Sequence, residues 1–175
     1  MRITVEELLQ RYAAGERDFS EIEMIDTNLR EVNLSGANLS RANLRGSNLY
    51  SANLRGVNLS GANLQLANLH SADLSRSNLK DTNLRDTTFD YGCLRGAILE
   101  RADLRNASLS EVDLSGANLE RANLRNASLF AAGLIEVNFK NADLEGVNMA
   151  EAVLKRINFE GANLNGAFYE DYEDI

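Results

Sequence analysis

Residues 37–44 read Ala-Asn-Leu-Ser-Arg-Ala-Asn-Leu, and residues 115–124 read Ser-Gly-Ala-Asn-Leu-Glu-Arg-Ala-Asn-Leu. The same motif, Ala-(Asn/Asp)-Leu followed by two polar or small residues, recurs along most of the chain. A leucine or another large apolar residue stands at every fifth position from Phe19 to Tyr169, without a slip in frame. Repetition of this kind indicates a fold built from stacked copies of one small unit.

The period of five residues excludes long regular elements. It matches neither the 3.6-residue period of an amphipathic helix nor the alternation of a long strand. Within a unit, the small residue and the leucine are two positions apart, which places both side chains on the same side of a short extended segment. The next two residues are most often Ser, Arg, Gly, Glu or Asn, which suit a corner. The pattern predicts a polygonal coil with one inward small–large pair on each side.

These stretches resemble the pentapeptide repeat family, whose pattern is A-(N/D)-L-x-x, and the resemblance covers residues 19–169. It implies an all-β solenoid, a right-handed quadrilateral parallel β-helix with four pentapeptides per coil and about 7–8 coils. A leucine-rich repeat is the nearest alternative, but the L-x-x-L-x-L strand of its longer unit is not found here.

The residues before the repeat predict a helical cap. Thr4 and Glu7 match a capping box, apolar residues follow at helical spacing, and Gly15 offers a stop. We expect a short helix over residues 5–14 to cover the first coil, because the ends of a solenoid must be shielded. Residues 8–19 also resemble the leader of cyanobacterial members of the family.

Three domains follow from these boundaries: an N-terminal helical cap at 1–17, the repeat at 18–169 and an acidic C-terminal tail at 170–175. Phe168, Tyr169 and Tyr172 are expected to close the last coil, and the acids of the tail to keep that end unpaired. Some family members dimerise through a C-terminal helix, which is not evident in this sequence, so a monomer is expected.

The least regular stretch runs from Thr87 to Leu99. Outward Asn is replaced there by Thr88, Cys93 and Ile98, and Gly92 replaces the inward small side chain. Because the frame is kept, the sequence predicts a local bulge or bend in a continuous rod. Cys93 is interpreted as a tolerated substitution, since no base accompanies it.

Composition excludes several classes of function. The 18 Lys and Arg residues against 26 Asp and Glu give a net charge of −8, which argues against direct nucleic-acid binding. One cysteine and one histidine cannot form a Cys/His zinc set, and neither a disulfide nor a metal site is expected. No long apolar stretch or export signal is visible, so the expected location is the cytoplasm, away from membranes.

Catalysis is not expected either. His70 has no serine, cysteine and carboxylate set around it that would make it a general base. The glycines follow the corners of the repeat and form no phosphate-binding loop, so no cofactor is expected. The protein is therefore predicted to be no enzyme.

Residues 20 positions apart should lie on the same side of the rod, and the four sides differ in charge. One side carries six carboxylates, two of them in the tail, with Arg30 as its only cation, and it also carries aromatic residues. We name its candidate partner-binding residues the acidic aromatic face: Tyr50, His70, Asp90, Tyr91, Glu111, Phe130 and Glu151.

Two other sides are richer in cations. One is predicted to be basic, with five cations against three carboxylates: Arg55, Arg76, Arg95, Lys155 and Arg156 against Asp73, Asp113 and Glu136. Another aligns arginines in a single column: Arg45, Arg85, Arg105 and Arg125.

Three interpretations of this surface remain. The charges are those of a solvated exterior, or the acidic aromatic face docks an unknown protein, since exposed aromatic residues anchor interfaces and charge steers association. The family resemblance implies a third, because some members mimic duplex DNA and bind type II topoisomerases such as gyrase. The arginine column and the basic side dilute a DNA-like field, so a rigid protein–protein interaction scaffold is the main hypothesis.

Overall fold

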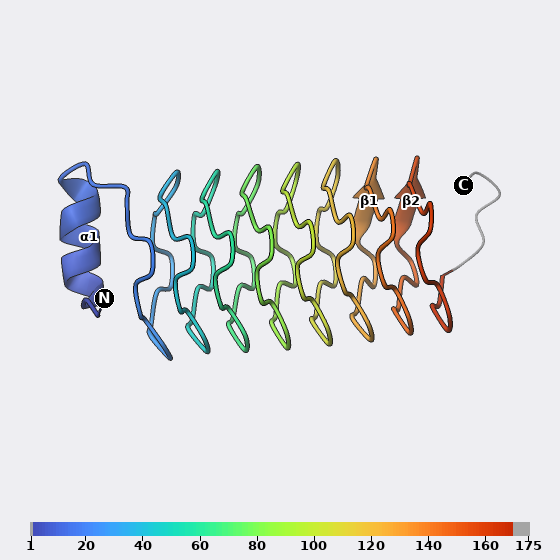
Figure 1. Ribbon diagram of the computed structural model, residues 1–175, viewed down its shortest axis with the longest axis horizontal. Coiled ribbons are helices and arrows are strands. Elements are labelled where there is room, and N and C mark those ends of the chain that lie inside the picture. The colour runs from blue at the N-terminus through green and yellow to red at the C-terminus, as the bar shows by residue number, and fades with distance from the viewer. Residues whose placement is uncertain (1, 170–175) are drawn as a thin grey trace.

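The computed structural model describes residues 2–169 as a short helix followed by a rod of stacked coils (Figure 1). Helix α1 (Val5–Ala13) lies at one end of the rod. Strands β1 (Gly133–Ile135) and β2 (Val153–Lys155) belong to neighbouring coils near the other end. The predicted acidic tail and Tyr172 lie outside the described residues.

The coils are in register with a period of 20 residues. Asn38 forms a parallel bridge with Asn58, and β1 pairs with β2 in parallel with Leu134 opposite Leu154. Backbone hydrogen bonds between coils alternate in direction. The amide of Leu39 donates to the carbonyl of Asn58 at 2.7 Å, and the amide of Asn58 donates to the carbonyl of Ala37 at 3.0 Å. A period of 20 with units of five gives the four-sided coil that the family resemblance implies.

Most sides of the coil form single bridges because a turn follows after only a few extended residues. In the unit at Leu39, the carbonyl of Leu39 accepts a hydrogen bond from the amide of Ala42 at 3.1 Å. Arg41, inside this turn, has a φ of 56°, and the same position has positive φ along the repeat. The preceding Asn38 accepts from the amide of Ser40 at 3.1 Å, which explains the preference for Asn or Asp there.

The inward positions form one continuous apolar core. The leucines and the small residues two positions before them are almost entirely buried from the first coils onward, as at Leu39 and Ala37, each 1% exposed. Leu154 is still buried, whereas Phe159 and Leu164 are only partly buried in the last described coil. The predicted pairing of a small and a large inward residue is confirmed.

The predicted bulge between Thr87 and Leu99 is wrong. Thr88, Cys93 and Ile98 each bridge to the residue 20 positions earlier, as Asn does elsewhere in the repeat. Backbone groups alone form these bridges, so a change of outward side chain leaves the register intact. A Cβ atom at Gly92 would lie 2.8 Å from the backbone carbonyl oxygen of Phe89, so the backbone leaves no room for a side chain there.

The helical cap forms as the sequence predicts, within one residue of the expected C-terminus. The Thr4 hydroxyl accepts a hydrogen bond from the amide of Glu7 at 3.1 Å and caps the first turn. Leu8 is fully buried, and the Tyr12 hydroxyl donates to the carbonyl of Ser35 at 2.9 Å. The helix therefore shields the apolar interior of the first coil.

Candidate functional site

The acidic aromatic face is built on one side of the coil. Its columns are held in register by parallel bridges every 20 residues, such as Asn48 with Asn68 and Ser108 with Ser128. The residue two positions after each of these bridging residues projects outward at the corner, which aligns Tyr50, His70 and Phe130 in one column. The fold thus places the predicted residues on one side of the rod.

Three rings of this face form a contiguous aromatic ladder, which we define as Tyr50, His70 and Tyr91. The centroids of Tyr50 and His70 are 5.4 Å apart, with only 6° between the ring planes. The centroids of His70 and Tyr91 are 5.2 Å apart and tilted by 60°. The distances follow from the spacing of the coils, which is close to the strand separation of a sheet.

Arg30 extends the ladder at its N-terminal end. Its guanidinium carbon lies 4.4 Å from the centroid of the Tyr50 ring, and one of its terminal nitrogens lies 4.0 Å from the Glu31 carboxylate. Sequence reasoning counted Arg30 as a charge of this side but missed its contact with a ring. The 20-residue step from Arg30 to Tyr50 is the signal that would have found it.

Tyr91 and Glu111 form the other end of the ladder. The Glu111 carboxylate, one coil away, raises the pKa of Tyr91 above its usual value through hydrogen bonding to the hydroxyl and through its negative charge. Tyr91 is 58% exposed, the most open ring of the ladder. Asp90 lies close by, and its carboxylate accepts from the Ser108 hydroxyl at 2.6 Å and the Ser110 amide at 2.9 Å.

Phe130 and Glu151 do not join this cluster. Phe130 is half-buried and takes part in no ring contact within residues 2–169. Ala131 separates Glu111 from Glu151 in their column, so the two carboxylates are two coils apart. The predicted face therefore contains a connected part, from Tyr50 to Glu111, and two separate residues.

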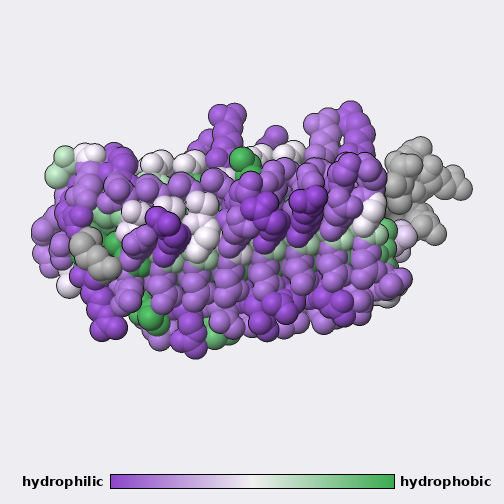
Figure 2. Space-filling model, viewed as in Figure 1, coloured by the Kyte–Doolittle hydropathy of each residue, from purple (hydrophilic) through white to green (hydrophobic). Residues whose placement is uncertain are grey.

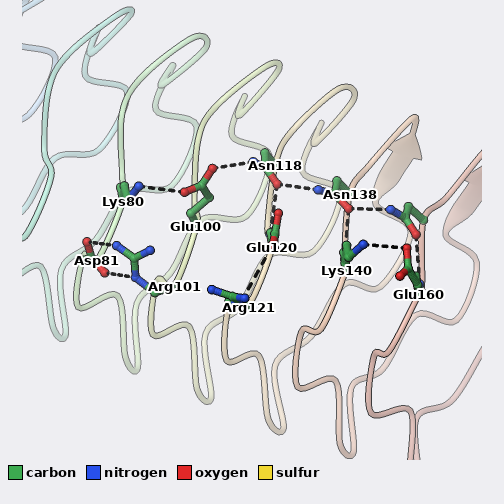
Figure 3. A network of polar contacts seen from close by, with 11 residues as sticks. Lys80, Asp81, Glu100, Arg101, Asn118, Glu120, Arg121, Asn138, Lys140 and Glu160 are labelled. Carbon is green, nitrogen blue, oxygen red and sulfur yellow. Dashed lines mark hydrogen bonds and ion pairs between the residues drawn. The ribbon is translucent and has the colours of Figure 1, made fainter.

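The side not singled out by sequence reasoning carries a network of polar contacts (Figure 3). Lys80 pairs with Glu100 at 2.9 Å, and Arg101 forms two bonds of 2.7 Å with Asp81, one coil away. Outward asparagines extend the network between coils, since the Asn138 amide donates to Asn118 at 2.9 Å. Opposite charges 20 positions apart are the signal that would have revealed it. Charge on this side is neutralised internally.

The arginine column is only partly neutralised. Arg105 pairs with Asp103, and Arg125 pairs with Asp143 at 3.2 Å and Glu145 at 2.6 Å. Arg45 and Arg85 form no ion pair with a carboxylate of residues 2–169. A column of arginines therefore does not amount to a column of free positive charge.

The predicted basic side is also partly neutralised. Arg55 contacts Asp73 at 3.0 Å and Arg95 contacts Asp113 at 3.2 Å.

The exterior seen in Figure 2 is largely hydrophilic, with apolar residues as isolated spots. An open hollow of about 290 Å³ lies on the predicted basic side, lined in part by Ser115 and Ile135.

The described part of the chain has neither a metal-binding cluster nor a membrane-spanning helix. Residues 2–169 contain no group of three His, Cys, Asp or Glu side chains placed to hold a metal ion. None of the helices described there is long and apolar enough to cross a membrane.

The 20-residue period of the bridges, the continuous apolar core and the turn at each corner together define a parallel β-helical solenoid with a polar exterior. A family profile described as Pentapeptide repeats (8 copies) matches residues 22–61, 62–101, 102–146 and 132–168. The chain belongs to the pentapeptide repeat family, for which the fold is a right-handed β-helix. No curated protein matches the chain.

Several solved structures are similar to it, among them two cyanobacterial ones. HetL from Nostoc sp. strain PCC 7120, a pentapeptide repeat protein involved in heterocyst differentiation regulation, is 31% identical; the match covers 94% of this chain and 92% of HetL, with a TM-score of 0.41. The pentapeptide repeat protein alr5209 from Nostoc PCC 7120 is 34% identical over 74% of this chain and 83% of its own, with a TM-score of 0.31. QnrB1, a plasmid-mediated fluoroquinolone resistance protein, is 16% identical over 90% and 88%, with a TM-score of 0.48.

Proposed function

We propose that this chain is a rigid, non-enzymatic scaffold of the cytoplasm that docks a protein partner through its acidic aromatic face. The aromatic ladder carries the proposal. Tyr50, His70 and Tyr91 lie in contact on the outside of the rod, where no core requires them. Exposed, clustered aromatic rings anchor interfaces because they bury much area with little loss of side-chain freedom.

The charge of the face supports the same proposal. Within the described part, four carboxylates stand on this side against Arg30 alone: Glu31, Asp90, Glu111 and Glu151. The side in Figure 3 differs, because its cations and carboxylates pair with one another. An uncompensated negative field steers a positively charged partner surface toward the rings.

A triple variant tests the docking proposal. Tyr50→Ser, Tyr91→Ser and Phe130→Ser together remove the two tyrosine rings of the ladder and the half-buried ring of Phe130. None of the three belongs to the buried core, and serine already stands at similar outward positions. We expect the triple variant to keep the thermal midpoint of the wild type and to lose, in affinity capture from the native organism, any protein that the wild type retains.

The matched control removes three outward side chains from the side in Figure 3: Lys80→Ser, Glu120→Ser and Lys140→Ser. This control variant should stay folded, because surface ion pairs contribute little to stability. It should also retain the captured protein, because the substituted side chains lie on a different side of the rod from the rings. A partner that binds the ring-deficient triple variant as well as the wild type would contradict the docking proposal.

Mimicry of duplex DNA toward a type II topoisomerase is the alternative function. The rod shape and the net charge of −8 favour it. The ion-pair networks weigh against it, because cations such as Arg101 and Arg125 interrupt any continuous phosphate-like array. Capture of a topoisomerase that also depends on carboxylates of other sides would favour this alternative over the scaffold.

A further inference from the structure

The two ends of the aromatic ladder carry the same pair of chemical groups, a tyrosine ring and a carboxylate. At the first end, the ring of Tyr50 and the carboxylate of Glu31 hold the Arg30 guanidinium, at 4.4 Å from the ring centroid and 4.0 Å from the nearest carboxylate oxygen. At the second end, Tyr91 and Glu111 stand 20 positions apart in the same column, and Asp90 directly precedes Tyr91.

Only the first end has its cation. Within residues 2–169, no Lys or Arg forms an ion pair with Asp90 or Glu111, and none lies over the ring of Tyr91. The hydroxyl and amide donors that Asp90 accepts from are uncharged. The second end therefore combines a ring that is 58% exposed with two carboxylates that form no ion pair with a Lys or Arg of the described residues.

We propose that Tyr91, Asp90 and Glu111 form a cation cradle that receives an arginine side chain of the partner protein. The proposal rests on the proposed docking function and names the chemistry that the partner must bring. A guanidinium is planar, so it stacks on a ring while its edge donates to a carboxylate. Arg30 of the chain itself lies over the Tyr50 ring one coil away, with the carboxylate of its neighbour Glu31 at 4.0 Å, so an arginine can lie between a ring and a carboxylate on this side of the rod.

Arginine fits the cradle better than a neutral side chain of the same shape. Each attraction, of ring for cation and of carboxylate for cation, depends on the positive charge. Citrulline keeps the planar shape and most of the hydrogen-bond donors but lacks the charge. Comparison of the two side chains therefore isolates the contribution that the cradle is proposed to make.

A nuclear magnetic resonance titration tests the cradle in the full-length protein. The probe is the peptide acetyl-Gly-Arg-Gly-amide at pH 7, with acetyl-Gly-citrulline-Gly-amide as its neutral counterpart. We expect saturable shifts centred on Tyr91 and Glu111, and binding of the citrulline peptide weaker by at least about fivefold. Equal binding of both peptides, or shifts centred on another side of the rod, would overturn the proposal.

Two variants should weaken arginine binding by about three- to tenfold each: Tyr91→Leu and Glu111→Gln. Leucine is compatible with the positive φ of Tyr91, because Leu66 occupies an equivalent corner with a φ of 62°. Glu136→Gln is the control, since it removes the same charge from a carboxylate that pairs with Arg156 on another side. Unchanged arginine binding in the Tyr91 and Glu111 variants would rule the cradle out.

The two proposals fail separately. If partner capture depends on the exposed rings but the peptides do not discriminate, the face docks its partner by other means and the cradle is wrong. If the arginine peptide binds selectively but partner capture does not depend on the rings, the cradle is supported and the docking function is wrong.

Discussion

At the scale of single residues, the repeat tolerates change outside the coil and resists it inside. Ile98 and Cys93 replace outward asparagine without disturbing the backbone bridges between coils. Gly92 is different, because it occupies an inward position beside Phe89, where the pattern calls for a side chain the size of alanine. Gly92 shares its side of the coil with Leu94, just after the turn that follows Phe89, and the backbone there leaves no room for the usual alanine.

Gly92→Ala should destabilise the protein by about 1–3 kcal/mol. The added Cβ would lie 2.8 Å from the Phe89 carbonyl oxygen and 3.2 Å from that of Ala72, and neither backbone can move freely. Thermal denaturation should show the loss as a midpoint lowered by several degrees.

Gly133→Ala is the matched control. A Cβ there meets nothing closer than 3.7 Å, and neither glycine has a positive φ. Its midpoint should be unchanged or slightly raised, since alanine restricts the unfolded chain. Equal midpoints for the two variants would mean that the coil around Phe89 adjusts at no cost.

At the scale of elements, α1 covers the open end of the first coil. Leu8 is the buried residue of the helix and joins the continuous core of the coils. Leu9, its neighbour, is 37% exposed and faces away. Replacing each leucine by alanine changes helix propensity by the same amount, so a difference between the two variants reports on burial.

Leu8→Ala should cost about 2–5 kcal/mol, because it leaves a cavity between the cap and the first coil. Hydrogen exchange should speed up first at amides of that coil, such as Phe19, which donates to Asn38 at 2.8 Å. Leu9→Ala should change stability by no more than about 0.5 kcal/mol. If both substitutions have the same small effect, α1 does not act as a cap.

At the scale of the whole molecule, charge is organised by ion pairs and hydrogen bonds between coils. The Arg101 bond holds the pKa of Asp81 below its usual value, and Lys80 does the same for Glu100. Bonds from Ser115 and Arg95 likewise outweigh partial burial and lower the pKa of Asp113. Such a carboxylate stabilises the fold at a pH above its unfolded pKa, and this contribution is lost as the pH falls through its lowered folded value.

Stability should therefore be level from about pH 7 to 5 and fall below about pH 4, where the unfolded carboxylates take up protons first. Thermal midpoints measured between pH 7 and 3 check this expectation. The net charge of −8 acts in the opposite direction, since its self-repulsion weakens on acidification. A midpoint that rises down to pH 4 would show that repulsion outweighs the paired carboxylates.

The sequence by itself determined the backbone and the core of this protein. Because each unit of five closes its own turn and buries its own Ala–Leu pair, the inward residues and the capping helix follow from local pattern, whereas four units per coil followed from the resemblance to the family. Only the tertiary structure decided which outward side chains meet. Tyr91 stands one position off the column of Tyr50 and His70 yet contacts His70, and Arg55 pairs with Asp73, 18 positions along the chain. The physical reason is that contacts at the corners form between coils 20 residues apart, and side-chain direction there depends on the neighbouring coil.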